Sequence, residues 1–183
     1  MSDLFSQLNL AKPSTQLADR TEKQFLKFHL YPDTKVMLPI RQITEVLKIQ
    51  FAQIVPIPQM PDWVMGVYNW RGDILWMVDL GHLIGLDPWY RQNINRSHHT
   101  AIVLSPDREQ DWAKGQSNIN LGLVVTRIED LEMCNTSAIQ TPSNSSISTQ
   151  LAPFLQGYWL NSEEMILVLD GKAIVAAMPN STN

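Results

Sequence analysis

Residues 69–72, with the sequence Asn-Trp-Arg-Gly, combine side chains that suit molecular recognition. Arg71 presents a planar, permanently charged fork, Trp70 offers an aromatic face beside it, and both residue types are enriched at the centres of binding interfaces. The apolar residues on either side are typical of a hairpin with this segment at its turn. The spacing equally allows Arg71 to be an ordinary turn residue that pairs with Asp73 or Asp79. The chemistry indicated here is binding at an exposed turn.

Side chains for acid–base or nucleophilic catalysis are few. The histidines are His29, His82, His98 and His99. No Gly-x-Ser-x-Gly elbow, phosphate-binding glycine loop or Cys-His pairing lies near any of them. His98 and His99 would point to opposite faces of a strand, which disfavours joint metal ligation, and we interpret them as exposed or strand-edge residues. The sequence predicts no enzyme activity, no metal site and no cofactor.

The carboxylates are dispersed as well. Glu129-Asp130 and Glu163-Glu164 are interpreted as solvated turn charges. Residues 161–162, Asn-Ser, precede the second pair and complete a hairpin loop with it. No catalytic pair of carboxylates is predicted.

Composition restricts the possible classes of protein. The 183 residues are 44% hydrophobic, enough for one compact domain or for two small subdomains that share a core. With 14 Lys and Arg against 18 Asp and Glu, a net charge of -4 disfavours nucleic-acid binding. The single cysteine excludes an intrachain disulfide, the N-terminus does not resemble a signal peptide, and no apolar stretch approaches the ~18 residues of a membrane span. We expect a cytoplasmic protein without direct membrane insertion.

Short apolar or alternating segments predict a series of strands. They span residues 24–30, 36–40, 43–49, 67–70, 74–78, 100–104, 121–128, 157–160 and 165–169. In the first strand Leu26, Phe28 and Leu30 share one face, so Lys27 and His29 are expected on the other, solvent-facing side. Strands this short and closely spaced favour barrels over a parallel sheet flanked by helices.

Three short helices and several loops complete the predicted elements. The helices are 61–65, 80–84 and 171–178. Asp79 and Gly85 are expected to cap the second helix, and Asp170 is expected to cap the third. The loops are 105–120 and 135–150, with 87–99 as a linker between two halves.

The six tryptophans are numerous for this length. We predict that Trp63, Trp76 and Trp159 pack in the core, because tryptophans on strands usually do. Trp70 is the exception, because it lies at the turn and is predicted to be exposed.

Several motifs follow one another along residues 36–86. They are Ile43-Thr44-Glu45-Val46, Pro58-Gln59-Met60-Pro61, Gly66-Val67-Tyr68-Asn69-Trp70-Arg71-Gly72 and Asp79-Leu80. This succession resembles the CheW family of chemotaxis coupling proteins. The match is looser after residue 86, where 121–125 and 165–170 fit the late strands of the family. The chain departs from the family at Trp70, where Leu or Ile is usual, and at Thr126-Arg127, where Asp is usual.

The resemblance implies a mainly β fold of two small five-stranded β-barrel-like subdomains that share a core, with a few short helices. The polar composition of residues 1–22 predicts a flexible arm, and it is followed by a CheW-like domain at 23–178 and a tail at 179–183. The first subdomain would cover about 23–90 and the second about 98–178.

The resemblance also implies a non-catalytic adaptor, recruited to membrane receptor arrays through its partners. It would couple the cytoplasmic tip of a methyl-accepting receptor to the regulatory domain of a CheA-type histidine kinase. The receptor-binding residues implied are Ile43, Glu45, Asn69, Trp70, Arg71 and Gly72. If Glu45 and Arg71 pair with each other, reversing both charges should restore binding. Kinase contact would involve the second subdomain, where no residues can be named.

Two alternatives stay open. One is a small-ligand-binding β-barrel that serves as a sensor accessory, which a cavity bounded by Trp70 or Trp76 would favour. The other is the detached regulatory end of a larger histidine kinase, which the lack of an upstream catalytic segment in 183 residues disfavours. The resemblance implies a role in motility that is flagellar or based on type IV pili, and the sequence does not decide between them. The polar arm and the departures from the family favour a pilus-based or phototaxis pathway.

Overall fold

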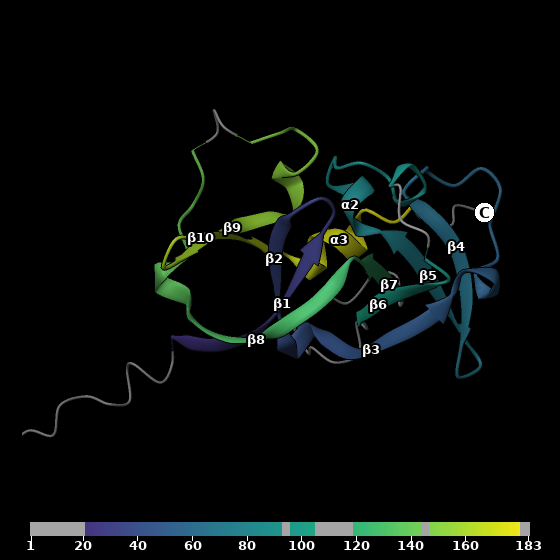
Figure 1. Cartoon of the computed structure of the whole chain (residues 1–183), viewed down its shortest axis with the longest axis horizontal. Coiled ribbons are helices and arrows are strands. Elements are labelled where there is room, and N and C mark those ends of the chain that lie inside the picture. Colours follow the sequence, from purple (N-terminus) through teal and green to yellow (C-terminus); the bar gives the residue numbers. More distant parts are fainter. Residues whose placement is uncertain (1–20, 93–95, 105–118, 144–146, 180–183) are drawn as a thin grey trace, which may run out of the picture.

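The computed structural model describes residues 21–92, 96–104, 119–143 and 147–179, and two five-stranded sheets dominate it (Figure 1). Sheet A has the order β8-β1-β2-β10-β9, and sheet B has the order β3-β6-β7-β5-β4. The strands of sheet A are β1 (Glu22–Leu30), β2 (Thr34–Pro39), β8 (Arg127–Asn135), β9 (Leu155–Asn161) and β10 (Glu164–Leu169). Those of sheet B are β3 (Ile43–Gln50), β4 (Val64–Trp70), β5 (Asp73–Asp79), β6 (His98–Leu104) and β7 (Asn120–Val125). The predicted mainly β, barrel-like class is confirmed.

Two of the three predicted helices are present. Asp79 caps α2 (Leu80–Leu83) by accepting a hydrogen bond from the backbone N of His82, and Asp170 caps α3 (Gly171–Ala176) in the same way. Gly85, with φ of +93°, follows α2 in the left-handed region that glycine adopts without strain. The 3₁₀ turns are η1 (Ile40–Gln42), η2 (Phe51–Gln53), η3 (Trp89–Arg91), η5 (Thr136–Ala138) and η6 (Ala152–Phe154).

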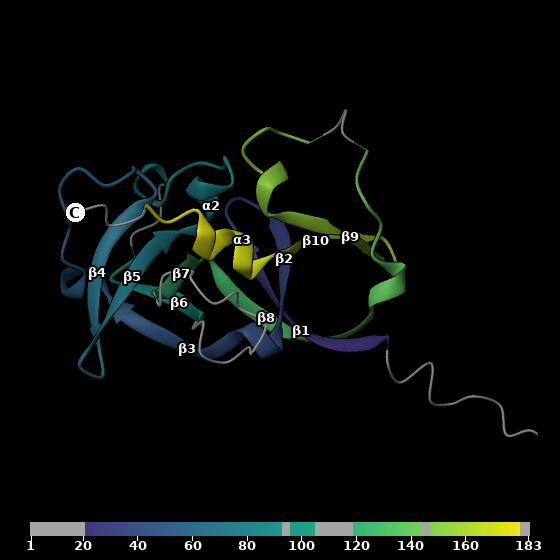
Figure 2. The same ribbon diagram turned by 180° about the vertical axis from the view of Figure 1, so that it is seen from behind.

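The core has three parts. Each sheet curls around a small apolar cluster of its own, centred on Phe25 and Met37 in sheet A and on Leu75 and Met77 in sheet B. A larger cluster joins the two sheets and takes in side chains of α3. Figures 1 and 2 show the sheets side by side with α3 between them. The two barrel-like units therefore share a core, in agreement with the expectation from sequence.

The strands are not divided between the sheets as the sequence suggested. The expected first subdomain, 23–90, contributes β1 and β2 to sheet A but β3, β4 and β5 to sheet B. Each sheet combines strands of both expected halves: β1 pairs with β8 and β3 with β6 in antiparallel fashion, while β2 pairs with β10 and β5 with β7 in parallel. Partners in a parallel pair lie far apart in the sequence, so local patterns do not reveal them.

From Phe25 to Leu30, strand β1 is buried on both faces, which corrects the prediction that Lys27 and His29 face solvent. Lys27 is 6% exposed and His29 is 4% exposed. Both side chains alternate with the shared-core residues of β1, so they lie on the face where Phe25 packs in the apolar cluster of sheet A, and glutamates of β8 pair with them there.

Two other predicted elements differ from the structure. The helix predicted at 61–65 is absent, because Val64 already begins β4 after a turn closed by the bond from its N to Pro61 O. The strand predicted at 121–128 breaks at Thr126, and β8 continues to Asn135, where a loop was expected to begin. Nearly all of the expected arm 1–22, loop 105–120 and tail 179–183 lies outside the described residues.

Candidate functional site

The turn between β4 and β5 has a defined backbone shape. Arg71 has φ of +55° and Gly72 has φ of +91°, and two successive positive values give the mirror-image tight turn typical of hairpins. The side chain of Asn69 accepts a hydrogen bond from Gly72 N at 3.0 Å and closes the turn. Asn69 and Gly72 therefore shape the loop that presents Arg71.

Glu45 on β3 holds this turn from across the sheet. Its carboxylate accepts a hydrogen bond from Trp70 Nε1 at 2.7 Å and pairs with Arg71 Nη2 at 2.9 and 3.0 Å. The guanidinium carbon lies 5.5 Å from the centre of the Trp70 ring, within the range of a cation–π contact. We call Glu45, Trp70 and Arg71 the hairpin cluster. It excludes the alternative in which Arg71 pairs with Asp73 or Asp79.

The hairpin cluster also brings together the two edges of sheet B. Strands β3 and β4 are the first and last in the strand order, yet Glu45 of β3 reaches Trp70 of β4. Only a strongly curled sheet allows this contact, and beneath it the indole packs against the apolar cluster of sheet B. The hairpin cluster thus joins the two edges of sheet B beside the turn between β4 and β5.

The six predicted receptor-binding residues differ in exposure: three are exposed, Glu45 and Trp70 are half-buried, and Ile43 is buried. Asn69, Arg71 and Gly72 are exposed, with 71% of the Arg71 side chain open to solvent. The prediction that Trp70 is exposed is wrong, because its half-buried ring packs against the apolar cluster of sheet B. Ile43 is 4% exposed in the shared core, so it supports β3 and is not a contact residue.

Ile74 is a surface residue that the sequence did not single out. It lies opposite Asn69 across the hairpin and is 61% exposed. Trp76 and Val78 point to the same side of β5 as Ile74, but Trp76 is half-buried and Val78 is fully buried. Exposure falls along this side of the strand because only its far end packs in the core shared with sheet A. Alternation alone could not show where this packing ends.

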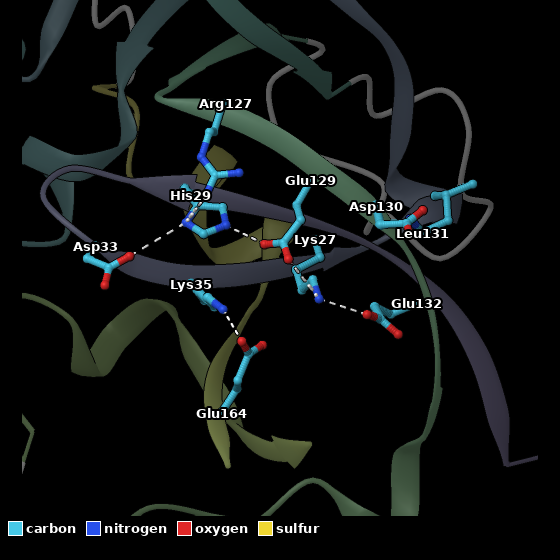
Figure 3. Close-up of polar contacts among 10 residues, drawn as sticks. All are labelled: Lys27, His29, Asp33, Lys35, Arg127, Glu129, Asp130, Leu131, Glu132 and Glu164. Atoms are coloured by element: carbon cyan, nitrogen blue, oxygen red, sulfur yellow. Dashed lines mark hydrogen bonds and ion pairs between the residues drawn. The ribbon is translucent and has the colours of Figure 1, made fainter. Parts of the chain in front are cut away.

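A second polar cluster joins β1 to β8 in sheet A (Figure 3). Lys27 Nζ lies 2.8 Å from Glu132 Oε1 and 3.2 Å from Glu129 Oε1, while His29 Nε2 bonds to Glu129. Arg127 Nη2 donates to His29 Nδ1 at 3.3 Å, so Nε2 is the nitrogen that donates to the carboxylate. We call Lys27, His29, Arg127, Glu129 and Glu132 the β1–β8 cluster.

The interpretation of the acidic pairs as solvated turn charges holds for Glu163, which is exposed in a turn, but is wrong for Glu129 and Glu164. Glu129 lies within β8 and is ion-paired, and Glu164 pairs with Lys35 between β10 and β2. The hydrogen bond to Glu132 raises the pKa of Lys27, in spite of burial. Burial alone would raise the pKa of Glu129, but the hydrogen bonds from His29 and Lys27 outweigh it and lower the pKa.

Within the described parts of the chain, no group of three or more His, Cys, Asp and Glu residues could hold a metal ion. Cys134 is buried, and burial raises the pKa of its thiol to about 11, so it is not a reactive thiolate at neutral pH. His99 is 5% exposed and not at an open strand edge as predicted, because Phe51 and Trp89 pack against it. Trp63, Trp76 and Trp159 pack against core clusters as predicted.

Comparisons with known proteins agree with this architecture. The family model for the CheW-like domain matches residues 24–178, and the chain belongs to this family. The crystal structure of the scaffolding protein TtCheW from Thermoanaerobacter tengcongensis superposes with a TM-score of 0.63 at 21% identity. That match covers 81% of this chain and 88% of the other, and at such identity it shows a shared fold. No curated protein matches the chain. None of the helices described is long and apolar enough to cross a membrane.

Proposed function

We propose that this protein is a non-catalytic adaptor that couples methyl-accepting chemoreceptors to a CheA-type histidine kinase in taxis. Membership of the CheW-like family supports a role in chemotaxis coupling. The observation that supports the receptor side most strongly is the hairpin cluster, in which Glu45 and Trp70 hold an exposed Arg71 in one orientation. A charged side chain that is already held in one orientation loses little conformational entropy when a partner binds.

The chemistry of the hairpin surface suits an amphipathic receptor helix. The Arg71 guanidinium has five N–H donors, and the contacts with Glu45 involve only Nη2, so others remain for an acidic group of the partner. Ile74, opposite Asn69, adds an exposed apolar side chain beside the cation. An apolar stripe on the helix would cover Ile74, and a neighbouring carboxylate would set its orientation.

The kinase contact is proposed to lie on sheet A. Strands β9 and β10 place Leu160 and Met165 opposite each other, 51% and 59% exposed. Leu131 and Met133 on β8 are 47% and 56% exposed. Neighbouring exposed apolar side chains, such as the cross-strand pair Leu160 and Met165, are typical of protein interfaces when they form a contiguous patch. The protein would then join cytoplasmic receptor arrays by contacting two partners through different sheets.

Two charge substitutions test these surfaces separately. Binding to a receptor cytoplasmic fragment and to the kinase regulatory domain from the same genome would be measured by surface plasmon resonance. We expect Arg71→Glu to weaken receptor binding by about 2 kcal/mol, roughly 30-fold, and to leave kinase binding unchanged. Met165→Glu should weaken kinase binding and leave receptor binding unchanged.

Lys48→Glu is the matched control, because Lys48 is an exposed cation on β3 outside the hairpin cluster. The same charge change there should leave both affinities unaltered. Loss of both contacts, or of folding, in Arg71→Glu would show that Arg71 is structural and would contradict the proposal. A kinase screen with the wild-type protein would identify the pathway, flagellar or pilus-based.

A further inference from the structure

A cavity of about 130 Å³ lies where the two sheets meet, away from the hairpin cluster. Tyr31 follows β1 of sheet A, Asp79 ends β5 of sheet B, and Trp89 belongs to η3. Arg96 and His99 form another part of the wall. A cavity of roughly this size can hold a molecule as large as benzene. Neither Trp70 nor Trp76 lines it, so it is not the cavity that the sequence-based sensor alternative required.

Asp79 is the acidic residue of the cavity wall, and among the described residues it has no ion pair with a cationic side chain. Asp79 is 3% exposed, and its carboxylate accepts one hydrogen bond from His82 N at 3.1 Å and one from Trp89 N at 2.8 Å. Each oxygen retains capacity for a further donor. Burial raises the pKa of Asp79, in spite of these two bonds. A donor with positive charge would stabilise this carboxylate.

His99 is a second polar side chain of the wall with unused hydrogen-bonding capacity. Its ring packs edge-on against Trp89 at 5.1 Å, and its Nε2 is buried without a hydrogen-bond partner in the described structure. A buried polar atom without a partner costs free energy that a ligand or a bound water can recover. Burial and, next, the Arg96 charge lower the pKa of His99 and so favour the neutral imidazole, which has one donor and one acceptor nitrogen.

Arg96 provides positive charge at the exposed side of the cavity. Its Nη1 donates to Thr126 O at 3.1 Å, and Thr126 also lines the cavity, so the guanidinium is anchored there. Leu30, Val124 and Val125 form an apolar part of the wall. The cavity thus combines a buried acid, a more exposed base and apolar surface, which together match a small molecule with opposite charges at two ends.

We propose that this cavity binds a small zwitterion of the amino-acid type, with its ammonium group on Asp79 and its carboxylate on Arg96. Glycine and alanine are of suitable size. The site is distinct from both proposed protein contacts, so it would add a small-molecule input to the adaptor.

The test is an NMR titration of the full-length protein with L-alanine, acetate and methylammonium chloride at constant ionic strength. We expect alanine to shift the Trp89 indole and His99 imidazole signals saturably, at lower concentration than either single-charge probe. Equal affinity for acetate or for methylammonium would overturn the zwitterion assignment, and the lack of a saturable shift with alanine would overturn the site.

Arg96→Gln is the informative variant, because Arg96 is exposed and its loss should not unfold the protein. We expect it to weaken alanine binding roughly tenfold or more, as for the loss of one charge-assisted hydrogen bond. Arg91→Gln is the control, because Arg91 is exposed on η3 but does not line the cavity. Unchanged alanine affinity in Arg96→Gln would contradict the proposal. Asp79→Asn is less decisive, since Asp79 also caps α2.

Discussion

The hairpin cluster of sheet B and the β1–β8 cluster of sheet A use similar chemistry at different depths. Each joins two strands through a cation that pairs with glutamate. In sheet A the cation is Lys27, whose side chain is 7% exposed, while in sheet B it is Arg71, whose side chain is 71% exposed. Removing one member of a buried ion pair leaves a poorly solvated charge without a partner, whereas an exposed cation keeps donors free for another molecule. The first cluster therefore suits stability and the second suits recognition.

Removal of the buried cation should have the largest effect. Lys27→Ala leaves Glu129 and Glu132 facing each other without their shared partner. We expect the free energy of unfolding to fall by about 3 kcal/mol, as for other buried ion pairs that lose one member. Urea denaturation followed by tryptophan fluorescence would measure it, with exposed Lys48→Ala as the control. Equal stability of the two variants would show that the burial of Lys27 does not make it more important for stability than an exposed lysine.

Loss of Glu45 should have a smaller effect on stability and a clear effect on binding. In Glu45→Ala, Trp70 Nε1 and Arg71 lose their acceptor and the edges of sheet B lose a contact. We expect a loss of about 1–2 kcal/mol in unfolding free energy, together with weaker receptor binding. Denaturation and receptor titration of the same preparation would give both values. Full receptor affinity in Glu45→Ala would mean that receptor binding does not depend on the contact between Glu45 and Arg71.

The double charge reversal Glu45→Lys with Arg71→Glu measures how much the ion pair of the hairpin cluster contributes to stability. The new pair can form in the opposite sense, but an ammonium group in place of the Glu45 carboxylate cannot accept the bond from Trp70 Nε1, so recovery should be partial. A double-mutant cycle in urea should give a coupling of about 0.5–1 kcal/mol. Additive effects of the two single variants would show that the charges do not interact in solution.

The smallest effect is the pH dependence of the β1–β8 cluster. Its hydrogen bonds hold the pKa of Glu129 below its usual value of 4.5, so the stabilisation is fully present above that pH. It should disappear as pH falls through the lower pKa of the folded state. The difference in unfolding free energy between wild type and Glu129→Gln should therefore shrink under acid. A difference that grows on acidification would contradict the pairing.

Features determined by neighbouring residues were predictable from the sequence. The caps at Asp79 and Asp170 and the turn at Arg71-Gly72 depend on local backbone chemistry, and the structure contains all three. The motifs of residues 36–86 indicated the family, and the match to residues 24–178 confirms it.

Features determined by distant pairing were not predictable. Lys27 and His29 alternate with apolar residues and so looked solvent-facing, but β8 and the curl of sheet A bury them. The bond between Trp70 and Glu45 joins residues 25 positions apart, and nothing in the local pattern marks it. The cavity at Asp79 and His99 requires both sheets to be in place, so no local motif reveals it.

The most direct test of the central claim uses the Trp70 indole as a reporter, because its N–H already bonds to Glu45 beside the turn. Two-dimensional NMR spectra would be recorded during separate titrations with the receptor fragment and with the kinase regulatory domain. We expect the Trp70 Nε1–H signal to shift with the receptor fragment and to stay in place with the kinase domain. A signal that stays in place at receptor saturation would contradict the assignment of the hairpin as the receptor-binding surface.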